Sequence, residues 1–315
     1  MADLVTLGEA MALLVSSEVM PLRFASSMHL TMAGSESNVA IGVRRLGPTA
    51  AWLGRVGDDE LGRLVLGRLR AENVELESVV VDSAAPTGLM LKERRTADVV
   101  RVVYYRRHSA GSRLGPEDLD EELVRSARLL HVTGITPALS ESARAAVRAA
   151  IAIARGAGVT VSLDFNYRSA LWTREAAATE LADLVRCVDV VFAGEDEAGL
   201  VVKAATPEEA ALALTELGPS QAAIKRGPRG AVLAIGGRTL RAEPVPARVV
   251  DPVGAGDAFV AGYLTGLLED AGPEEALRMA ATAGAFAVTF AGDWEGLPMR
   301  SELALLEESE GTVLR

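Results

Sequence analysis

The sequence contains one cysteine and only three histidines in 315 residues. A single cysteine, Cys187, excludes a disulfide framework and any thiolate-rich zinc or iron–sulfur site. The histidines, at positions 29, 108 and 131, have none of the short spacings that metal sites use. These residue types therefore give no sign of a structural metal centre.

Long apolar segments and an excess of positive charge are also lacking. No charge-free stretch reaches the roughly 18 residues that a membrane span requires, and residues 279–292 come nearest. Asp and Glu outnumber Lys and Arg by 43 to 32, for a formal net charge of −11. So acidic a chain argues against a nucleic-acid binder, which would show a basic face, and against docking on anionic lipid. An anionic substrate would have to be held by local positive groups.

The N-terminal residues give no sign of a secretory signal. Residues 1–4 do not form the basic region that precedes the apolar run of a signal peptide. A reducing cytoplasm is therefore the expected location.

Short apolar runs alternate with segments of helical spacing along most of the chain. The strand-like runs are residues 4–8, 50–56, 128–132, 160–163, 188–192 and 222–225. The helical patterns cover residues 37–46, 58–73, 140–155, 174–185 and 207–217. This alternation is typical of parallel strands covered by helices on both faces. It predicts one doubly wound, mostly parallel α/β domain over residues 1–315.

Two segments interrupt this alternation. Residues 10–33 are apolar without a helical period, and the runs 87–93 and 99–107 flank a polar turn, as in a β-hairpin. We expect segments of about 10–33 and 86–108 to form a small β-sheet lid that closes over a ligand. The alternative is a dimerisation sheet, and the same element could serve both purposes, so a homo-oligomer through the lid is left open.

The glycine-rich segment Asp251-Pro-Val-Gly-Ala-Gly-Asp257 leads directly into an apolar helix. Gly254 and Gly256 would let backbone N–H groups converge at the helix N-terminus, where they favour negative charge. Asp257 stands where its carboxylate could take a proton from a hydroxyl group, as phosphoryl transfer requires. The alternative is that Asp257 only caps the helix. A dinucleotide fingerprint is excluded because Phe259 replaces its third glycine, and no Walker loop is present.

A second segment, Ala33-Gly-Ser-Glu-Ser-Asn-Val-Ala40 leading to Gly47, precedes this one by about 220 residues. With both segments in this order, the sequence resembles the ribokinase-like, PfkB-type carbohydrate kinases over nearly its whole length. The resemblance implies a ribokinase-like fold, ATP as phosphoryl donor and Mg²⁺ as cofactor. It leaves a requirement for a monovalent cation open.

In that family the residue matching Asp257 is the catalytic base, and the backbone of Gly254, Ala255 and Gly256 forms the anion hole. Glu197 matches a glutamate that positions magnesium through water, with a solvated helix start as the alternative. The resemblance assigns nucleotide binding to residues at the ends of two predicted strands: Asn166, Tyr167, Arg168, Lys225, Arg226, Gly227 and Gly230. The alternatives are that Asp164 is only a strand-end cap and that residues 225–230 are an ordinary hairpin turn. Two positions depart from the family pattern. The family more often has asparagine where this chain has Gly194, and some members carry an asparagine near Ala281 that contacts the adenine.

The expected sugar site combines the first motif with the lid. The residues that would face the sugar hydroxyls are Gly34, Ser35, Glu36, Ser37 and Asn38. Tyr104 and Tyr105 precede Arg106, and an aromatic beside an arginine suits a small polyol with a carboxylate, which guanidinium binds bidentately. Arg106 and Arg168 would then clamp a sugar acid. Alternatively, Arg106 and Arg107 form a solvated strand edge.

The segments 104–112, 134–140 and 164–168 are most similar to 2-keto-3-deoxygluconate kinases. That resemblance implies that Asp293 contacts the sugar hydroxyls, with a simple turn residue as the alternative. Met90, where a tyrosine is expected, counts against it. The sequence therefore predicts phosphorylation of 2-keto-3-deoxygluconate on its terminal hydroxyl, giving the 6-phosphate. The alternatives are a kinase for fructose, ribose or a nucleoside, and a non-catalytic sugar-binding regulatory protein on a kinase fold.

Overall fold

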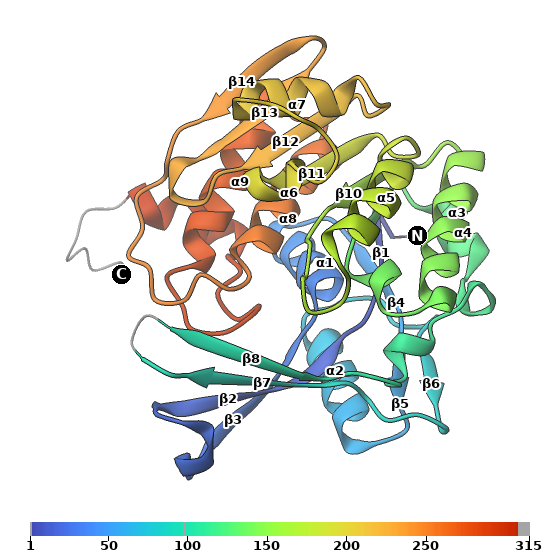
Figure 1. The fold of residues 1–315 in the computed structure, drawn as a ribbon, viewed down its shortest axis with the longest axis vertical. Helices are drawn as coiled ribbons and strands as arrows, with labels where there is room; N and C mark the ends of the chain where they lie inside the picture. Colours follow the sequence, from blue (N-terminus) through green and yellow to red (C-terminus); the bar gives the residue numbers. More distant parts are fainter. Residues whose placement is uncertain (1, 97–98, 308–315) are drawn as a thin grey trace.

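The computed structural model describes residues 2–96 and 99–307, and within these residues eight strands form the central sheet (Figure 1). Their order is β14-β13-β12-β11-β10-β9-β1-β4. Along this order, neighbouring strands from β12 through β11, β10, β9 and β1 to β4 pair parallel. The pairs β12–β13 and β13–β14 are antiparallel. The bounds are β1 Leu4–Leu7, β4 Ala50–Leu53, β9 Leu129–Thr133, β10 Thr160–Asp164, β11 Val190–Gly194, β12 Gln221–Lys225, β13 Ala231–Ile235 and β14 Arg238–Ala242.

Helices cover both faces of this sheet, which confirms the α/β prediction (Figure 1). One face packs against α3 (Glu121–Ser126), α4 (Glu141–Gly156), α5 (Arg174–Val185) and α7 (Pro207–Thr215). The other packs against α1 (Ser35–Leu46), α2 (Glu60–Ala71), α8 (Ala255–Leu268) and α9 (Pro273–Ala287). Successive strand residues alternate between the two cores, since Val191 belongs to the first and Val190 and Phe192 to the second. This burial on both faces explains why the strands read as continuous apolar runs.

The lid is a separate four-stranded sheet in the order β3-β2-β7-β8. Its strands are β2 (Met11–Val19), β3 (Met28–Ala33), β7 (Leu89–Arg94) and β8 (Val100–Tyr105). Strands β7 and β8 pair antiparallel, which confirms the predicted hairpin, although residues 97 and 98 of its turn lie outside the described residues. In Figure 1 this sheet projects below the central body.

The remaining elements are short. Strands β5 (Arg55–Gly57) and β6 (Val80–Asp82) pair with each other, and α6 (Glu195–Ala198) directly follows β11. The 3₁₀ turns span Leu22–Phe24, Gly111–Arg113, Pro116–Asp118, Thr136–Ala138, Gly227–Arg229 and Arg300–Glu307. No helix in residues 2–96 and 99–307 is long and apolar enough to cross a bilayer.

Two parts of the sheet differ from the sequence-based expectation. The predicted strand over residues 50–56 is interrupted at Gly54, where a side chain would collide with the Trp52 ring and the Gly8 carbonyl. The β13–β14 hairpin was not predicted. Its turn is Gly236-Gly237, with φ of 57° and 73°, the left-handed pair that a two-residue hairpin turn requires.

Candidate active site

A pocket of about 480 Å³ lies between the lid and the carboxyl ends of the central strands. This edge is where open α/β sheets bind ligands. Most of the residues predicted from the sequence meet here, from both halves of the chain and from the lid. They are Gly34, Ser35, Glu36, Asn38, Tyr104, Arg106, Asn166, Arg168, Glu197, Lys225, Gly254, Gly256, Asp257 and Asp293.

Other predicted residues do not line this pocket: Ser37, Tyr105, Tyr167, Arg226, Gly227, Gly230 and Ala255. The Ser37 hydroxyl donates to the Gly34 carbonyl, so it supports the motif from behind. Tyr105 is 62% exposed because alternate strand residues face opposite ways and its neighbour Tyr104 faces the pocket. Gly227 and Gly230 lie in the tight turn between β12 and β13, at φ of 55° and 77°, as the hairpin-turn alternative expected.

The N-terminus of α8 opens into the pocket. Gly254 precedes the first helical residue, Ala255, and has a φ of 81°. Gly256, by contrast, lies within the first helical turn, where a side-chain carbon would stand 3.6 Å from Lys225 Nζ. Of the two, only Gly254 has a backbone conformation that requires glycine. Gly256 leaves space beside the Lys225 ammonium group. Unpaired amides, the helix dipole and Lys225 together favour a bound anion.

The change Gly254→Ala is expected to remove activity and destabilise the protein. Its Cβ would lie 2.1 Å from the Asp293 carbonyl oxygen, in a backbone region that L residues avoid. We expect the unfolding free energy to fall by about 1–3 kcal/mol or more, which urea denaturation would measure. The turn itself should be displaced. The matched control is Gly67→Ala, on the exposed side of α2 with no atom near the new Cβ, which should be neutral or stabilising. Equal effects of the two changes would contradict this role of Gly254.

Asp257 is held by two side chains of α1. Ser35 Oγ donates to Oδ1 at 2.7 Å, and Asn38 Nδ2 donates to Oδ2 at 2.8 Å. The same Asn38 amide also donates to Asp293 Oδ2 at 2.9 Å, so it joins the two carboxylates. These bonds come from α1 rather than from the first turn of α8, which argues against a mere helix cap. They fix the carboxylate at the pocket wall.

The environment of Asp257 raises its pKa. Burial has the largest effect, the charge of Asp293 adds to it, and the bonds from Asn38 and Ser35 and the charge of Arg168 oppose it. Burial likewise raises the pKa of Asp293. A base works best when its pKa lies nearer the working pH than that of an ordinary carboxyl group.

We expect kcat/KM to fall on the acid side of its pH profile, because only ionised Asp257 can accept a proton. The apparent pKa of this limb should exceed the roughly 3.9 of an ordinary aspartate. Initial rates between about pH 4 and pH 9 would measure it. The residual rate of Asp257→Asn should lack the limb, and a wild-type rate that is flat down to about pH 4 would exclude a raised carboxyl pKa.

An ion pair between partly buried Lys225 and buried Asp164 lies beside the anion site. Lys225 Nζ contacts the two oxygens of Asp164 at 2.7 and 2.6 Å. Burial raises the pKa of Asp164 to about 6, against the opposing effect of Lys225. Although burial acts to lower the pKa of Lys225, the carboxylates of Asp164, Glu197 and Asp257 raise it above its usual value. Lys225 thus stays positively charged at neutral pH, next to the space where phosphate would lie.

Glu197 accepts the backbone N–H groups of Gly194 at 2.6 Å and Tyr167 at 2.8 Å. It therefore ties the start of α6 to the loop after β10. That loop holds Asn166, at a φ of 40°, whose amide donates to Ser35 Oγ at 2.6 Å. Arg168, the next but one residue, is exposed and lines the pocket.

Arg106 is buried, at 9% exposure, which excludes the solvated strand edge as its role. Its Nε and Nη2 contact Glu9 Oε2 at 2.7 and 2.5 Å, and Ser109 also donates to Glu9. Glu9 was not predicted, although it directly follows the strand-like run 4–8. The neighbouring Arg107 is exposed, as a solvated edge would be.

Tyr104 and Met90 complete this wall of the pocket. They lie directly opposite each other on β8 and β7. The Arg106 guanidinium stands 5.5 Å from the centre of the Tyr104 ring, a cation–π contact. The phenol of Tyr104 thus offers this wall of the pocket a hydrogen-bonding group, which the Met90 side chain lacks.

Glu36, a buried residue of α1, also lines the pocket. It accepts hydrogen bonds from Thr133 at 2.7 Å and Thr136 at 2.6 Å, and burial raises its pKa. Its two threonine partners were not predicted, because they belong to a different strand and turn.

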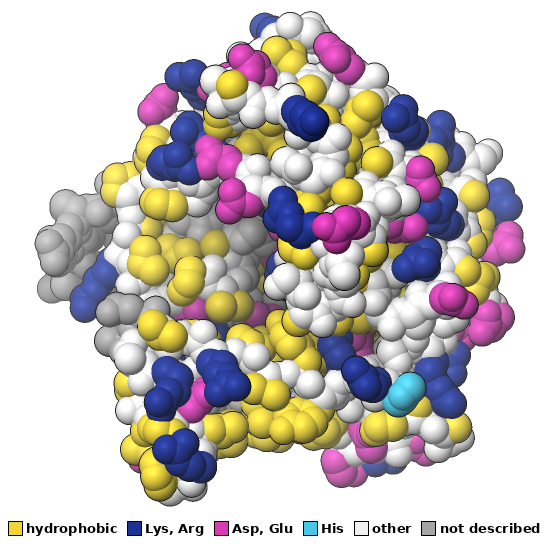
Figure 2. All heavy atoms as spheres, viewed as in Figure 1, with side chains coloured by type: hydrophobic (Ala, Val, Ile, Leu, Met, Phe, Trp, Pro, Cys, Tyr) yellow, Lys and Arg dark blue, Asp and Glu magenta, His cyan; other side chains and the backbone are white. Residues whose placement is uncertain are grey.

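Figure 2 shows Lys and Arg side chains gathered on the lid, at the lower left of the view. The chain as a whole carries a net charge of −11. Arg106, Arg168 and Lys225 add positive groups within the pocket. The local charge therefore meets the requirement for an anionic substrate on an acidic protein.

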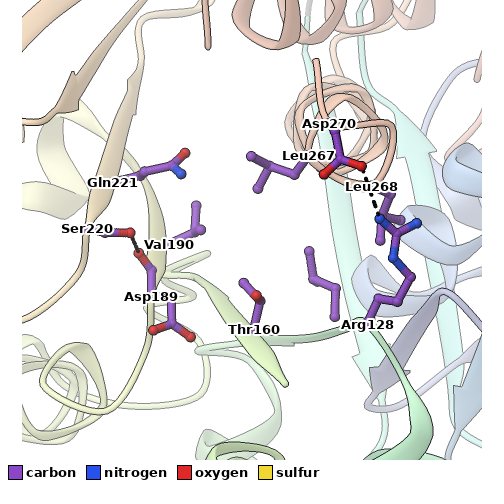
Figure 3. A pocket seen from close by; sticks show the side chains of 10 residues that line it. Arg128, Thr160, Asp189, Val190, Ser220, Gln221, Leu267, Leu268 and Asp270 are labelled. Carbon is purple, nitrogen blue, oxygen red and sulfur yellow. Dashed lines mark hydrogen bonds and ion pairs between the residues drawn. The ribbon is translucent and has the colours of Figure 1, made fainter. Parts of the chain in front are cut away.

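A second hollow, of about 420 Å³, lies at the amino ends of β9 to β12. Figure 3 shows Arg128 paired with Asp270 there, and Asp189, Ser220 and Gln221 on the facing wall. It adjoins the C-terminal end of α8, whereas Asp257 lies in the first turn, so roughly 20 Å of helix separates the two pockets. No glycine-rich turn or helix N-terminus faces this hollow among its lining residues, and it offers no comparable anion site.

Comparisons with known proteins agree with this geometry. A model described as the pfkB family of carbohydrate kinases matches residues 1–300. A 2-dehydro-3-deoxygluconokinase of Bacillus subtilis is 37% identical over 314 residues, covering 99% of this chain and 97% of the relative. One of Thermoproteus tenax is 39% identical over 307 residues, covering 96% and 93%. The crystal structure of a PfkB protein from Polaromonas is 38% identical, with a TM-score of 0.89 over 96% of this chain and 99% of the other.

Proposed function

The chain belongs to the pfkB family of carbohydrate kinases, and from this premise we propose that it transfers the γ-phosphate of ATP to the terminal hydroxyl of 2-keto-3-deoxygluconate. This compound is also called 2-dehydro-3-deoxygluconate, which links it to the names of the two relatives. The observation that carries the proposal is Asp257, held by Ser35 and Asn38 in a pocket that also contains Arg106 and Arg168.

The sugar acid would lie between the lid and α1. Its carboxylate would meet Arg106 and Arg168, since guanidinium groups bind carboxylates through paired hydrogen bonds. Its hydroxyl groups would meet Asn38, Asp293 and Tyr104. This arrangement directs the far end of a short polyol toward Asp257.

Asp257 would accept the proton of that hydroxyl as its oxygen attacks the γ-phosphorus in line. The amides at the start of α8 and the ammonium of Lys225 would stabilise the charge on the transferred group. The lid would exclude water, which otherwise competes as the acceptor.

The pocket fits magnesium that is carried mainly by the nucleotide. No cluster of three or more His, Cys, Asp or Glu within the described residues is arranged to hold a metal ion. Glu197, whose carboxylate already accepts two amides, would hold Mg²⁺ through water. When bound, Mg²⁺ neutralises charge on the β- and γ-phosphates.

The other sequence-based functions are not favoured. The relatives named above act on a sugar acid rather than a neutral sugar, according to their names. The non-catalytic alternative requires a damaged site, whereas Asp257, Gly254 and Lys225 all meet in the pocket. A dimer through the lid stays a prediction.

ADP release over a panel of sugars, with mass and NMR analysis of the product, tests the proposal. It should show turnover of 2-keto-3-deoxygluconate, a product phosphorylated on its terminal oxygen, and far slower turnover of fructose, ribose and adenosine. A faster rate on any neutral sugar would replace the proposed substrate, and no ADP release with the whole panel would refute the kinase.

A further inference from the structure

Lys92 is a charged residue in an unusual place. It lies on lid strand β7 between Val15 of β2 and Val102 of β8, and its side chain is 1% exposed. Burying a charge is costly unless it is paired, so such a residue needs a specific partner. No role was predicted for Lys92 from the sequence.

Two oxygens from different loops receive its ammonium group. Lys92 Nζ donates to Asp251 Oδ2 at 2.5 Å and to the Gly292 carbonyl at 3.3 Å. The Gly292 backbone N–H also points to Asp251 Oδ2, at 3.4 Å. The ammonium therefore joins the loop that begins with Asp251 to the loop that carries Asp293.

Both loops line the pocket, one through Val253 and Gly254 and the other through Asp293. Asp251 opens the glycine-rich turn, where its Oδ1 accepts the Val253 N–H at 3.2 Å. Gly254 packs so closely on the other loop that a Cβ would meet the Asp293 carbonyl. A positive charge between Asp251 and Gly292 thus holds in register the turn that bears the anion site and Asp257.

The space between Asp251 and Gly292 suits a cation of unit charge, but it leaves no room for a free metal or ammonium ion. A carboxylate oxygen and a carbonyl oxygen beside an anion site are the ligands that a monovalent ion such as K⁺ or NH₄⁺ would accept. Here the ammonium of Lys92, similar to them in charge and size, already lies against both oxygens. A free ion at the same point would be repelled by it.

We propose that Lys92 supplies a built-in monovalent cation to the catalytic turn, so that the kinase needs no added K⁺ or NH₄⁺. The proposal rests on the kinase function proposed above. Lys92 acts as a positioning residue, because it contacts the loops around the site and not the reacting atoms. Since it lies on the lid, the cation reaches the turn only with the lid in place.

The first test compares wild-type turnover in chloride salts of K⁺, NH₄⁺, Na⁺ and choline at equal ionic strength. Equal rates are expected in all four. A rate that rises several-fold with K⁺ or NH₄⁺ would overturn the proposal, while no turnover in any salt would instead refute the kinase function.

The second test removes the ammonium by Lys92→Ala, with Lys203→Ala, an exposed lysine, as the matched control. In choline chloride, kcat should fall about 100-fold, as expected when reacting groups are misplaced. NH₄⁺, K⁺ or methylammonium should restore much of it in a saturable way, while the control should resemble the wild type. A Lys92→Ala variant as active as the wild type, or one that no cation restores, would contradict the proposal.

Stability gives a readout that does not depend on turnover. The same cations should raise the Tm of Lys92→Ala by about 2 °C or more over choline, and leave the wild-type Tm unchanged. Lys92→Gln fills the space with a neutral amide, so cations should restore neither its rate nor its stability. If cations rescued Gln as well as Ala, or if Ala did not fold in any salt while Gln was fully active, Lys92 would be only a structural tether.

Discussion

The change Asp257→Asn is expected to lower kcat by about 10³-fold while leaving ATP binding nearly unchanged. Asparagine keeps the size of the side chain but cannot accept a proton. Its amide can still pair with Ser35 and Asn38, which hold the carboxylate in the wild type. Single-turnover rates and ATP titrations measure the two effects separately. Near-normal turnover would remove Asp257 from the mechanism.

The same variant should be at least as stable as the wild type at neutral pH. Because the pKa of Asp257 is raised by burial, the folded state binds its proton more tightly than the unfolded state. Its contribution to stability is therefore present at low pH and is lost as the pH rises through the folded pKa. A neutral residue avoids this loss, and urea denaturation at pH 8 would show it. A variant that is inactive because it unfolds would be recognised at once.

The second large effect is expected at Arg106. The change Arg106→Ala removes the guanidinium that we propose binds the substrate carboxylate, and it should lower kcat/KM for the sugar acid by about 100-fold or more. For the neutral amide of the same acid, the change should lower kcat/KM much less, because the amide forms no ion pair with Arg106. The ratio of the two kcat/KM values, measured by ADP release, isolates the charge recognition. An unchanged ratio would show that Arg106 serves the lid alone.

Glu9 complicates that experiment, because Arg106→Ala leaves its buried carboxylate without the guanidinium. Breaking one half of a buried pair is strongly destabilising. The double change Glu9→Gln with Arg106→Ala removes both charges and should recover stability without recovering discrimination. Arg107→Ala is the matched control, since that side chain is exposed and does not line the pocket.

The sequence predicted the fold and the motif residues because both are local patterns. Short apolar runs and helical spacings reflect burial, which the two cores confirm. The glycine-rich turn and the segment 33–40 are short motifs whose residues act next to one another. The resemblance that they carry assigned Asp257 and residues 34–38 to one site, but it did not predict the hydrogen bonds from Ser35 and Asn38 to Asp257.

The partners of buried charges could not be predicted in this way. Glu9 and Arg106 are 97 residues apart, Asp164 and Lys225 are 61 apart, and Lys92 and Asp251 are 159 apart. Each pair forms only when the lid or the sheet is assembled, so no spacing along the chain reveals it. Orientation was a second limit, since Ser37 and Tyr105 share a motif with pocket residues but face elsewhere.

A structure with a non-hydrolysable ATP analogue, Mg²⁺ and 2-keto-3-deoxygluconate would test the central claim most directly. The γ-phosphorus should lie on the amides at the start of α8, with the terminal hydroxyl in hydrogen-bond contact with Asp257 and the carboxylate on Arg106 and Arg168. A triphosphate bound elsewhere, such as in the hollow beside Arg128 and Asp270, or a sugar whose hydroxyls all lie far from Asp257, would contradict the account.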